Sequence, residues 1–300
     1  MRGRAMGPKS SDFGGTSRGA AGGPATVSPD ELPGLLYLAT RLAEEAGALL
    51  LTMSSDEARA TLRDGATRKS SRTDLATEAD RESERLIRSA LAAARPDDGI
   101  LGEEGGTTRG ASGLTWVVDP LDGTINFVYG FPAWSVSIAL VDESGSAIVG
   151  VVHDPELGET FRASRGHGAS LDGDALHIGP PPPLAECLVA TGFGYAEERR
   201  HAQASLLPRL LPAVRDVRRA GSAALDLCWV ACGRLDAFYE AGLSTWDFAA
   251  GVLIAEEAGA ASTSLSGIVP GAPTLVVGPP DRLPELVALL EGREHSGPHG

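Results

Sequence analysis

Apolar residues recur at helical spacing near the start of the chain, and those that share one face are Leu35, Leu38, Leu42, Ala46 and Leu49. This pattern predicts an amphipathic helix over residues 32–53. Its start is left open, because Ser28 and Glu31 resemble a capping box while Pro33 would then lie inside the helix. A second helical pattern covers residues 78–94 and ends before a proline, and a polar stretch lies between the two helices.

Short apolar runs separated by glycine-containing turns follow the second helix. Two of them, at residues 100–101 and 114–118, each lead into acidic residues. The others alternate apolar and polar residues, which predicts an antiparallel meander over residues 134–142, 147–153 and 159–163.

A run of prolines at residues 180–183 precedes a half of the chain in which strands and helices alternate. We expect strands at residues 187–191, 235–240 and 274–277, and helices at residues 203–211, 223–231, 247–258 and 283–291. Such an order is typical of mixed sheets covered by helices, so the predicted fold class is α/β or α+β.

The proline run also predicts a boundary between two subdomains. We expect an N-terminal α+β subdomain at residues 29–179 and a C-terminal α/β subdomain at residues 184–291. The Gly-, Ser- and Arg-rich residues 1–28 are expected to form a disordered tail, and residues 292–300 a loose one.

Composition limits the classes of function. The chain has 300 residues, of which 42% are hydrophobic and 22% charged, as in soluble globular proteins. No apolar run approaches the roughly 20 residues that span a bilayer, and the start lacks the apolar core of a secretory signal. The net charge of −14 disfavours nucleic acid as a ligand, and only three cysteines are present. We therefore expect a cytoplasmic protein with reduced thiols that binds neither membrane nor nucleic acid.

The most informative chemistry lies in residues 119–124, which read Asp-Pro-Leu-Asp-Gly-Thr and follow a strand-like run. Two carboxylates at this spacing can hold hard cations. The amides of Gly123 and Thr124, if they open a helix, would point at an anion. Taken alone, such a motif is more often a solvated acidic turn, so its meaning depends on the rest of the chain.

Three more acidic residues occupy comparable positions. Glu103 follows a strand, whereas Asp80 and Asp247 lie near the starts of predicted helices. Because open α/β sheets bind ligands at strand ends, these carboxylates can converge on one crevice with Asp119 and Asp122. Individually, each is more simply explained as a helix cap or a surface charge.

Four blocks resemble the motifs of the inositol monophosphatase family, in the family's order and at similar spacing. They are residues 74–80 (DLATEAD), 102–104 (GEE), 116–127 (WVVDPLDGTINF) and 246–251 (WDFAAG). The chain is most similar to bacterial inositol-1-monophosphatases, and the resemblance covers residues 32–290. It implies the layered αβαβα fold of the sugar phosphatases, Mg²⁺-dependent hydrolysis of a phosphate monoester, inhibition by lithium and a homodimer.

Matched position by position, the resemblance implies a metal centre. Glu103, Asp119 and the carbonyl of Leu121 would bind a first Mg²⁺, and Asp119 would bridge to a second held by Asp122 and Asp247. Some members of the family hold a third, weaker Mg²⁺ near the glutamate. Ligands that are all oxygen suit this cation.

The resemblance also implies catalytic and substrate-binding residues. A metal-activated water would be the nucleophile, with Thr124 and Asp80 relaying its proton and Glu103 acting through the metal. The amides of Gly123 and Thr124 would bind the phosphate. The remaining substrate contacts would come from Gly221, Ser222, Ala223, Glu240 and Asp247.

Two substitutions relative to the family's usual motifs are conservative: Ser222 stands where Thr is common and Leu121 where Ile is common. Lys69 matches a lysine near the metals in the family, and a solvated surface lysine is an almost equally good explanation.

Other functions stay open at this stage. The same chemistry could act on histidinol phosphate, fructose 1,6-bisphosphate or a phosphoadenosine nucleotide, each of which relatives hydrolyse. A protein of another class, a regulatory binding protein on the same fold, is a further alternative. The small phosphorylated substrate is therefore predicted by class only.

Overall fold

The computed structural model describes three parts of the chain, residues 27–65, 67–68 and 75–293. The predicted tails, residues 1–28 and 292–300, lie outside these ranges apart from their innermost residues, and so does Lys69.

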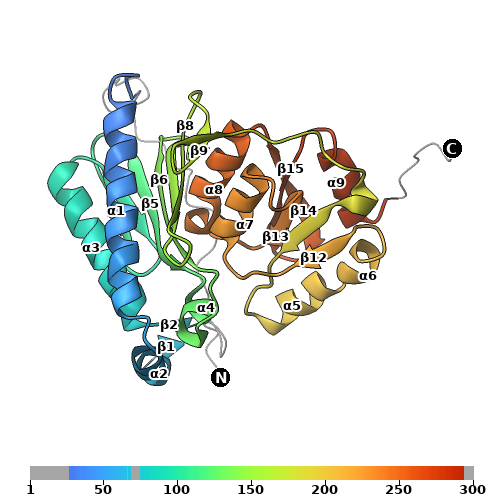
Figure 1. Ribbon diagram of the computed structural model, residues 1–300, viewed down its shortest axis with the longest axis horizontal. Helices are drawn as coiled ribbons and strands as arrows, with labels where there is room; N and C mark the ends of the chain where they lie inside the picture. The colour runs from blue at the N-terminus through green and yellow to red at the C-terminus, as the bar shows by residue number, and fades with distance from the viewer. Residues whose placement is uncertain (1–26, 66, 69–74, 294–300) are drawn as a thin grey trace, which may run out of the picture.

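The secondary structure is arranged in five layers (Figure 1). Helices α1 and α3 cover the outer face of a large sheet, and α7 and α8 lie between this sheet and a smaller one. The other face of the small sheet packs against α6 and α9. These helices are α1 (Leu32–Thr52), α3 (Glu78–Ala94), α6 (Leu207–Leu210), α7 (Ala223–Ala231), α8 (Thr245–Glu257) and α9 (Leu283–Glu291). The predicted αβαβα fold class is thus confirmed.

The large sheet has eight strands in the order β10-β9-β8-β7-β6-β5-β3-β4. All its pairs are antiparallel except β3 with β5, so the predicted meander is present. The strands are β3 (Gly99–Gly102), β4 (Gly106–Thr108), β5 (Thr115–Asp122), β6 (Ser135–Val141), β7 (Ala147–Asp154), β8 (Glu159–Ser164), β9 (Ala169–Leu171) and β10 (Asp174–Leu176).

The small sheet has five strands in the order β12-β11-β13-β15-β14. Strand β11 pairs in parallel with β12 and β13, and the other pairs are antiparallel. The strands are β11 (Leu188–Thr191), β12 (Asp216–Arg218), β13 (Ala237–Ala241), β14 (Ala261–Val269) and β15 (Ala272–Gly278).

Shorter elements connect these layers. They are α2 (Asp56–Gly65), β1 (Thr67–Arg68), β2 (Leu75–Ala76), α4 (Thr124–Tyr129), the 3₁₀ helix η1 (Leu184–Glu186) and α5 (Glu197–Ala204).

The core between the sheets contains residues from both halves of the chain. Val152 of β7 and Phe238 of β13, for example, belong to one buried cluster with α7 and α8. The two sheets separate at the proline run, where a subdomain boundary is predicted, but this shared core crosses it. The division into two subdomains stays a prediction.

The structure shows where helix α1 begins, which the sequence left open because of Pro33. The helix begins at Leu32 with Pro33 in its first turn, where an amide would have no helical acceptor. The backbone N–H and the hydroxyl of Ser28 both donate to Glu31 Oε2, at 3.0 and 2.9 Å. The capping interaction therefore lies just ahead of the helix.

Some elements differ from the sequence prediction. Residues 203–211 were expected to form one helix, but α5 ends at Ala204 and α6 is a separate short turn. Helix α2 is not among the predicted elements, and none of its residues is fully buried. Strand β14 also has no regular alternation of exposed and buried residues.

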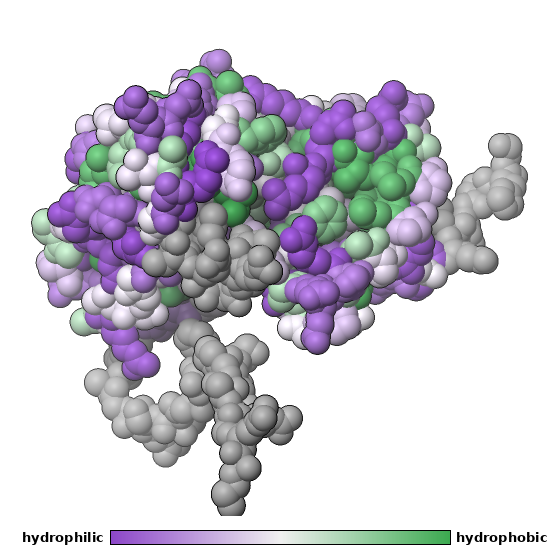
Figure 2. All heavy atoms as spheres, turned by 90° about the horizontal axis from the view of Figure 1, so that it is seen from below, coloured by the Kyte–Doolittle hydropathy of each residue, from purple (hydrophilic) through white to green (hydrophobic). Residues whose placement is uncertain are grey.

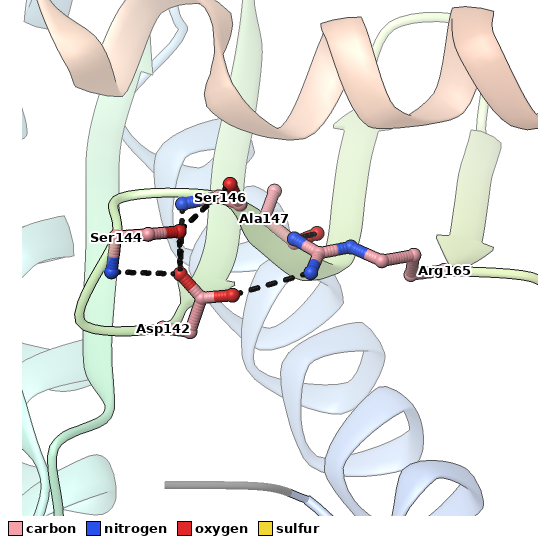
Figure 3. A network of polar contacts seen from close by, with 5 residues as sticks. All are labelled: Asp142, Ser144, Ser146, Ala147 and Arg165. Atoms are coloured by element: carbon pink, nitrogen blue, oxygen red, sulfur yellow. Dashed lines mark hydrogen bonds and ion pairs between the residues drawn. The ribbon is translucent and has the colours of Figure 1, made fainter. Parts of the chain in front are cut away.

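One carboxylate closes the turn between β6 and β7 (Figure 3). Asp142 Oδ1 accepts hydrogen bonds from the backbone N–H groups of Ser144 (2.9 Å) and Ser146 (3.1 Å), and Oδ2 lies 3.2 Å from Arg165 Nη1. Burial raises the pKa of Asp142, but these hydrogen bonds outweigh it and leave that pKa below its ordinary value. The charged carboxylate thus stabilises the hairpin.

Hydrophilic and hydrophobic residues are unevenly spread over the surface. On the face in Figure 2, hydrophilic residues dominate over the N-terminal half, and hydrophobic residues gather over part of the C-terminal half. In the described ranges, no helix combines the length and the apolar character that a membrane span requires.

Candidate active site

Strand β5 positions the first carboxylate by alternation. Trp116 and Val118 pack beneath α1 and α3, whereas Val117 packs in the core shared with α7 and α8. Asp119 therefore faces the layer between the two sheets, where it is 2% exposed.

The second carboxylate follows an irregularity in the same strand. Asp119 pairs with Ser137 of β6 and Asp122 with Ser135, so the register shifts between them. Residues 119–124 were predicted to follow a strand-like run, but β5 continues through Asp122. The extra residue on β5 is typical of a bulge, which re-aims side chains next to sites.

Both aspartates line a cavity of about 470 Å³. Residues of both halves of the chain form its wall. Its predicted site residues are Glu103, Asp119, Leu121, Asp122, Gly123, Thr124, Gly221, Ala223, Glu240 and Asp247. The predicted convergence of scattered acids on one crevice therefore occurs for Glu103, Asp119, Asp122 and Asp247, whereas Asp80 does not line the cavity.

Asp122 joins the two halves directly. Its Oδ2 accepts hydrogen bonds from the hydroxyl of Ser222 (2.6 Å) and from the backbone N–H of Ala224 (2.8 Å). These donors lie at the start of α7, where the helix dipole favours a negative charge. Ser222 itself is fully buried and absent from the cavity wall, so its hydroxyl serves Asp122.

Asp247 is held in a similar way at the start of α8. The backbone N–H of Ser244 donates to Asp247 Oδ2 at 2.6 Å. Burial, followed by the charges of Glu103, Asp122 and Asp247, raises the pKa of Asp119 well above its ordinary value. Asp119 is thus close enough to the other three carboxylates to be repelled by them.

Thr124 and Asp80 form a hydrogen-bonded pair behind the cavity. Thr124 Oγ1 lies 2.7 Å from Asp80 Oδ1 and 3.2 Å from the carbonyl oxygen of Leu121. Asp80 is fully buried, and its Oδ2 accepts from the backbone N–H of Thr77 at 2.8 Å. Only Thr124 of the pair lines the cavity.

Glu240 reaches the cavity from the small sheet. Phe238 packs toward α7 and Tyr239 toward α6 and α9, so the alternation of β13 directs Glu240 to the inner layer. Part of its surface stays open to the cavity. Burial raises its pKa to about 8, although Arg219 opposes this shift.

Several residues of the site were not singled out in the sequence. Arg219 and Arg199 line the cavity, and so does Gly192. Asp226 is 1% exposed, and its Oδ1 has no hydrogen-bond partner in the described part of the chain. Burial, then the charges of Glu240 and Asp122, raises its pKa. Residues 192–195 and 217–226 also resemble bacterial inositol-1-monophosphatases in sequence, but that resemblance led to no predicted role for Gly192, Arg219 or Asp226.

The donor set of the cavity fits a hard cation. In the present side-chain positions, no three His, Cys, Asp or Glu residues of the described ranges form a ready-made metal site. The carboxylates that face the cavity are nevertheless all oxygen donors, and burial with mutual repulsion raises the pKa of Asp119 and Asp247. A divalent cation would offset that repulsion.

Fold and cavity together define the class of the chain, the phosphoric monoester hydrolases of αβαβα architecture. Residues 32–293 match the model of the inositol monophosphatase family, and the chain belongs to this family.

Named relatives agree with this assignment. An inositol-1-monophosphatase of Mycobacterium bovis is 45% identical over 278 residues, which cover 88% of this chain and 96% of the relative. The solved structure of SuhB from Mycobacterium tuberculosis is 42% identical with a TM-score of 0.74, covering 88% of this chain and 98% of that one. A relative from Xylella fastidiosa, named Nus factor SuhB, is 45% identical over 74% of this chain and 78% of its own length.

Proposed function

We propose that the chain hydrolyses myo-inositol 1-phosphate, or a related inositol phosphate, to inositol and phosphate in the presence of Mg²⁺. The observation that carries this proposal is the meeting of Glu103, Asp119, Asp122 and Asp247 at one cavity whose wall also contains Glu240. The name of the Mycobacterium bovis relative supports the choice of substrate.

The carboxylates would hold two Mg²⁺ ions, or three if a weaker one binds near Glu103. Glu103, Asp119 and the Leu121 carbonyl would hold one ion, and Asp119, Asp122 and Asp247 another. When bound, the ions would neutralise the phosphate charge and favour ionisation of the attacking water.

Thr124 and Asp80 would move the proton. Thr124 accepts a proton at Oγ1 from the attacking water and passes its own hydroxyl proton to Asp80 Oδ1 along their 2.7 Å hydrogen bond. Because Thr77 holds the other oxygen of Asp80, the carboxylate keeps one oxygen aimed at Thr124.

The substrate would be oriented from two sides. The amides of Gly123 and Thr124 would bind phosphate oxygens. Glu240 would accept hydrogen bonds from ring hydroxyls, and the backbone at Gly221 and Ala223 would contact the ring. Ser222 would contribute through Asp122 rather than through the ring, because its hydroxyl points to that carboxylate.

The direct test is phosphate release from inositol 1-phosphate with Mg²⁺, with EDTA and Li⁺ as inhibitors. Asp122→Asn should lower kcat by at least about 100-fold, the loss typical of one electrostatic group in a site. The exposed Asp97→Asn is the matched control and should retain full activity. Near-normal turnover by a folded Asp122→Asn protein would refute the proposal.

A different phosphate ester is the main alternative within this chemistry. Histidinol phosphate suits Glu240, because a carboxylate also binds an ammonium group, and fructose 1,6-bisphosphate or a phosphoadenosine nucleotide would use the same metal site. The kcat/KM values over these esters decide between them, and a preference for histidinol phosphate would displace inositol phosphate.

The name of the Xylella fastidiosa relative, Nus factor SuhB, favours a regulatory binding role as a second candidate. Full complementation of a deletion strain by a Glu103→Gln variant would support that role, since it would need no catalysis. Failure to complement, with normal amounts of variant protein, would favour the enzyme.

We also propose that the protein acts as a cytoplasmic homodimer. Light scattering during size-exclusion chromatography should give twice the mass of the 30.9 kDa chain, and a mass equal to one chain would contradict the dimer.

A further inference from the structure

Helix α3 presents three buried polar side chains on one face, at spacings of three and four residues. Asp80 and Ser83 are fully buried and Glu84 is 2% exposed. Residues at this spacing are neighbours on a helix surface. Each of the three contacts a different segment of the candidate metal centre.

The three contacts are hydrogen bonds across the interface with the large sheet. Asp80 accepts from Thr124, and Ser83 Oγ donates to the carbonyl oxygen of Pro120 at 2.8 Å. Glu84 accepts from two successive backbone N–H groups, Glu104 to Oε2 at 2.7 Å and Gly105 to Oε1 at 2.8 Å. The last two amides directly follow Glu103.

The turn that carries Glu103 is wrapped around the Glu84 carboxylate. A Cβ at Gly102 would lie 2.3 Å from Glu84 Oε1, and a Cβ at Gly105 would lie 2.6 Å from it. Real side chains do not approach this closely, so both glycines are needed for the wrap. Arg88 completes it, because its Nη1 lies 3.2 Å from Glu84 Oε1 and 3.0 Å from the carbonyl oxygen of Gly106.

Glu84 has no part in the proposed chemistry, since it does not line the cavity. Burial of a carboxylate costs stability unless its oxygens are hydrogen-bonded. The oxygens of Glu84 are satisfied by the backbone amides of Glu104 and Gly105 and by Arg88. We propose that Glu84 is a positioning residue that fixes the turn after β3 and thereby holds Glu103 in place for the divalent cation. The inference rests on the proposed role of Glu103 as a metal ligand.

Glu84→Gln tests this role with little change of volume. An amide side chain has one acceptor oxygen and cannot accept both N–H groups in the way a carboxylate does. We expect Mg²⁺ affinity, measured by calorimetric titration, to fall about 10- to 100-fold, as for other residues that orient metal ligands. At saturating Mg²⁺, KM for the phosphate ester should stay unchanged.

The second readout needs neither metal nor activity. The amides of Glu104 and Gly105 should exchange with deuterium faster in Glu84→Gln than in the parent protein, because their acceptor is weakened. Glu82→Gln is the matched control, a glutamate on the same helix that pairs with Arg85 at the surface, and it should change neither readout.

Gly105→Ala keeps the test decisive if Glu84→Gln does not fold. Gly105 is exposed, so alanine there should leave the fold intact while its Cβ displaces the Glu84 carboxylate. Gly179→Ala, where a Cβ meets open space, is its control.

Unchanged Mg²⁺ affinity and unchanged exchange at the turn in the folded variants would overturn the role of Glu84. A parent protein that takes up no Mg²⁺ would instead refute the proposed function, while amide exchange would still decide whether Glu84 fixes the turn.

Discussion

At the residue scale, Glu240 of β13 packs against Gly192, which directly follows the neighbouring strand β11. A Cβ at position 192 would lie 1.9 Å from Glu240 Oε2, so the carboxylate occupies the space that any other side chain would need. Gly192 therefore sets the position of the group proposed to bind ring hydroxyls.

Gly192→Ala should displace Glu240 and raise KM for inositol 1-phosphate about tenfold, which corresponds to losing one hydrogen bond worth roughly 1.4 kcal/mol. Hydrolysis of p-nitrophenyl phosphate, which has no ring hydroxyls, should be unaffected. An equal loss on both substrates would show that the substitution damages the metal centre instead of ring recognition.

The sequence predicted the carboxylates of the cavity well, but not the residues that hold them in place. Asp119, Asp122, Glu103 and Asp247 were singled out, and all line the cavity. Glu84 was missed because a glutamate inside a helix is normally a surface charge, and only the fold places it beneath a turn. Ser222 was predicted to contact the substrate, and its contact with Asp122 was not foreseen.

At the element scale, the hydroxyl of Ser222, the N-cap residue of α7, makes two hydrogen bonds. Ser222 Oγ accepts from the backbone N–H of Leu225 at 3.2 Å and donates to Asp122 Oδ2. The same residue thus caps the helix and fixes a carboxylate of the other half of the chain.

Ser222→Ala should lower the free energy of unfolding by about 1–2 kcal/mol, the upper range for loss of an N-cap. Ser222→Thr keeps the hydroxyl and should retain most of that stability, and the exposed Ser205→Ala should change it by less than about 0.5 kcal/mol. Urea denaturation measures these differences. A loss in Ser222→Thr as large as in Ser222→Ala would mean that packing, not the hydroxyl, matters there.

Elements were predicted well where one apolar face meets a core. The bounds of α3 and α9 match the prediction, since each has a buried stripe. Helix α2 and strand β14 were missed because they lie at the surface and carry no such stripe. Their positions are set by tertiary contacts that a local pattern does not contain.

At the scale of the whole molecule, the cavity gathers carboxylates that bind protons more tightly when folded. Burial raises the pKa of Asp122 to about 6 and that of Glu240 to about 8. The folded protein therefore holds protons that the unfolded chain releases, so its stability falls as pH rises from about 4 to about 8. Mg²⁺ competes with protons for the same oxygens.

The melting temperature of the EDTA-treated protein should accordingly be lower at pH 8 than at pH 5. Added Mg²⁺ should raise the melting temperature more at pH 8, where fewer protons compete. The buffers contain no Ca²⁺, which would compete for the site, and their ionic strength is matched so that charge screening is the same at both pH values. If Mg²⁺ raised the melting temperature equally at both pH values, ion binding would not depend on the ionisation of these carboxylates.

The central claim is that carboxylates from both halves of the chain surround the same divalent ions. Anomalous diffraction from crystals soaked in Mn²⁺ tests it most directly. The account predicts peaks within coordinating distance of Glu103, Asp119 and Asp122 on one side and Asp247 on the other. Ions bound elsewhere, or an Asp247 that contacts none of them, would contradict it.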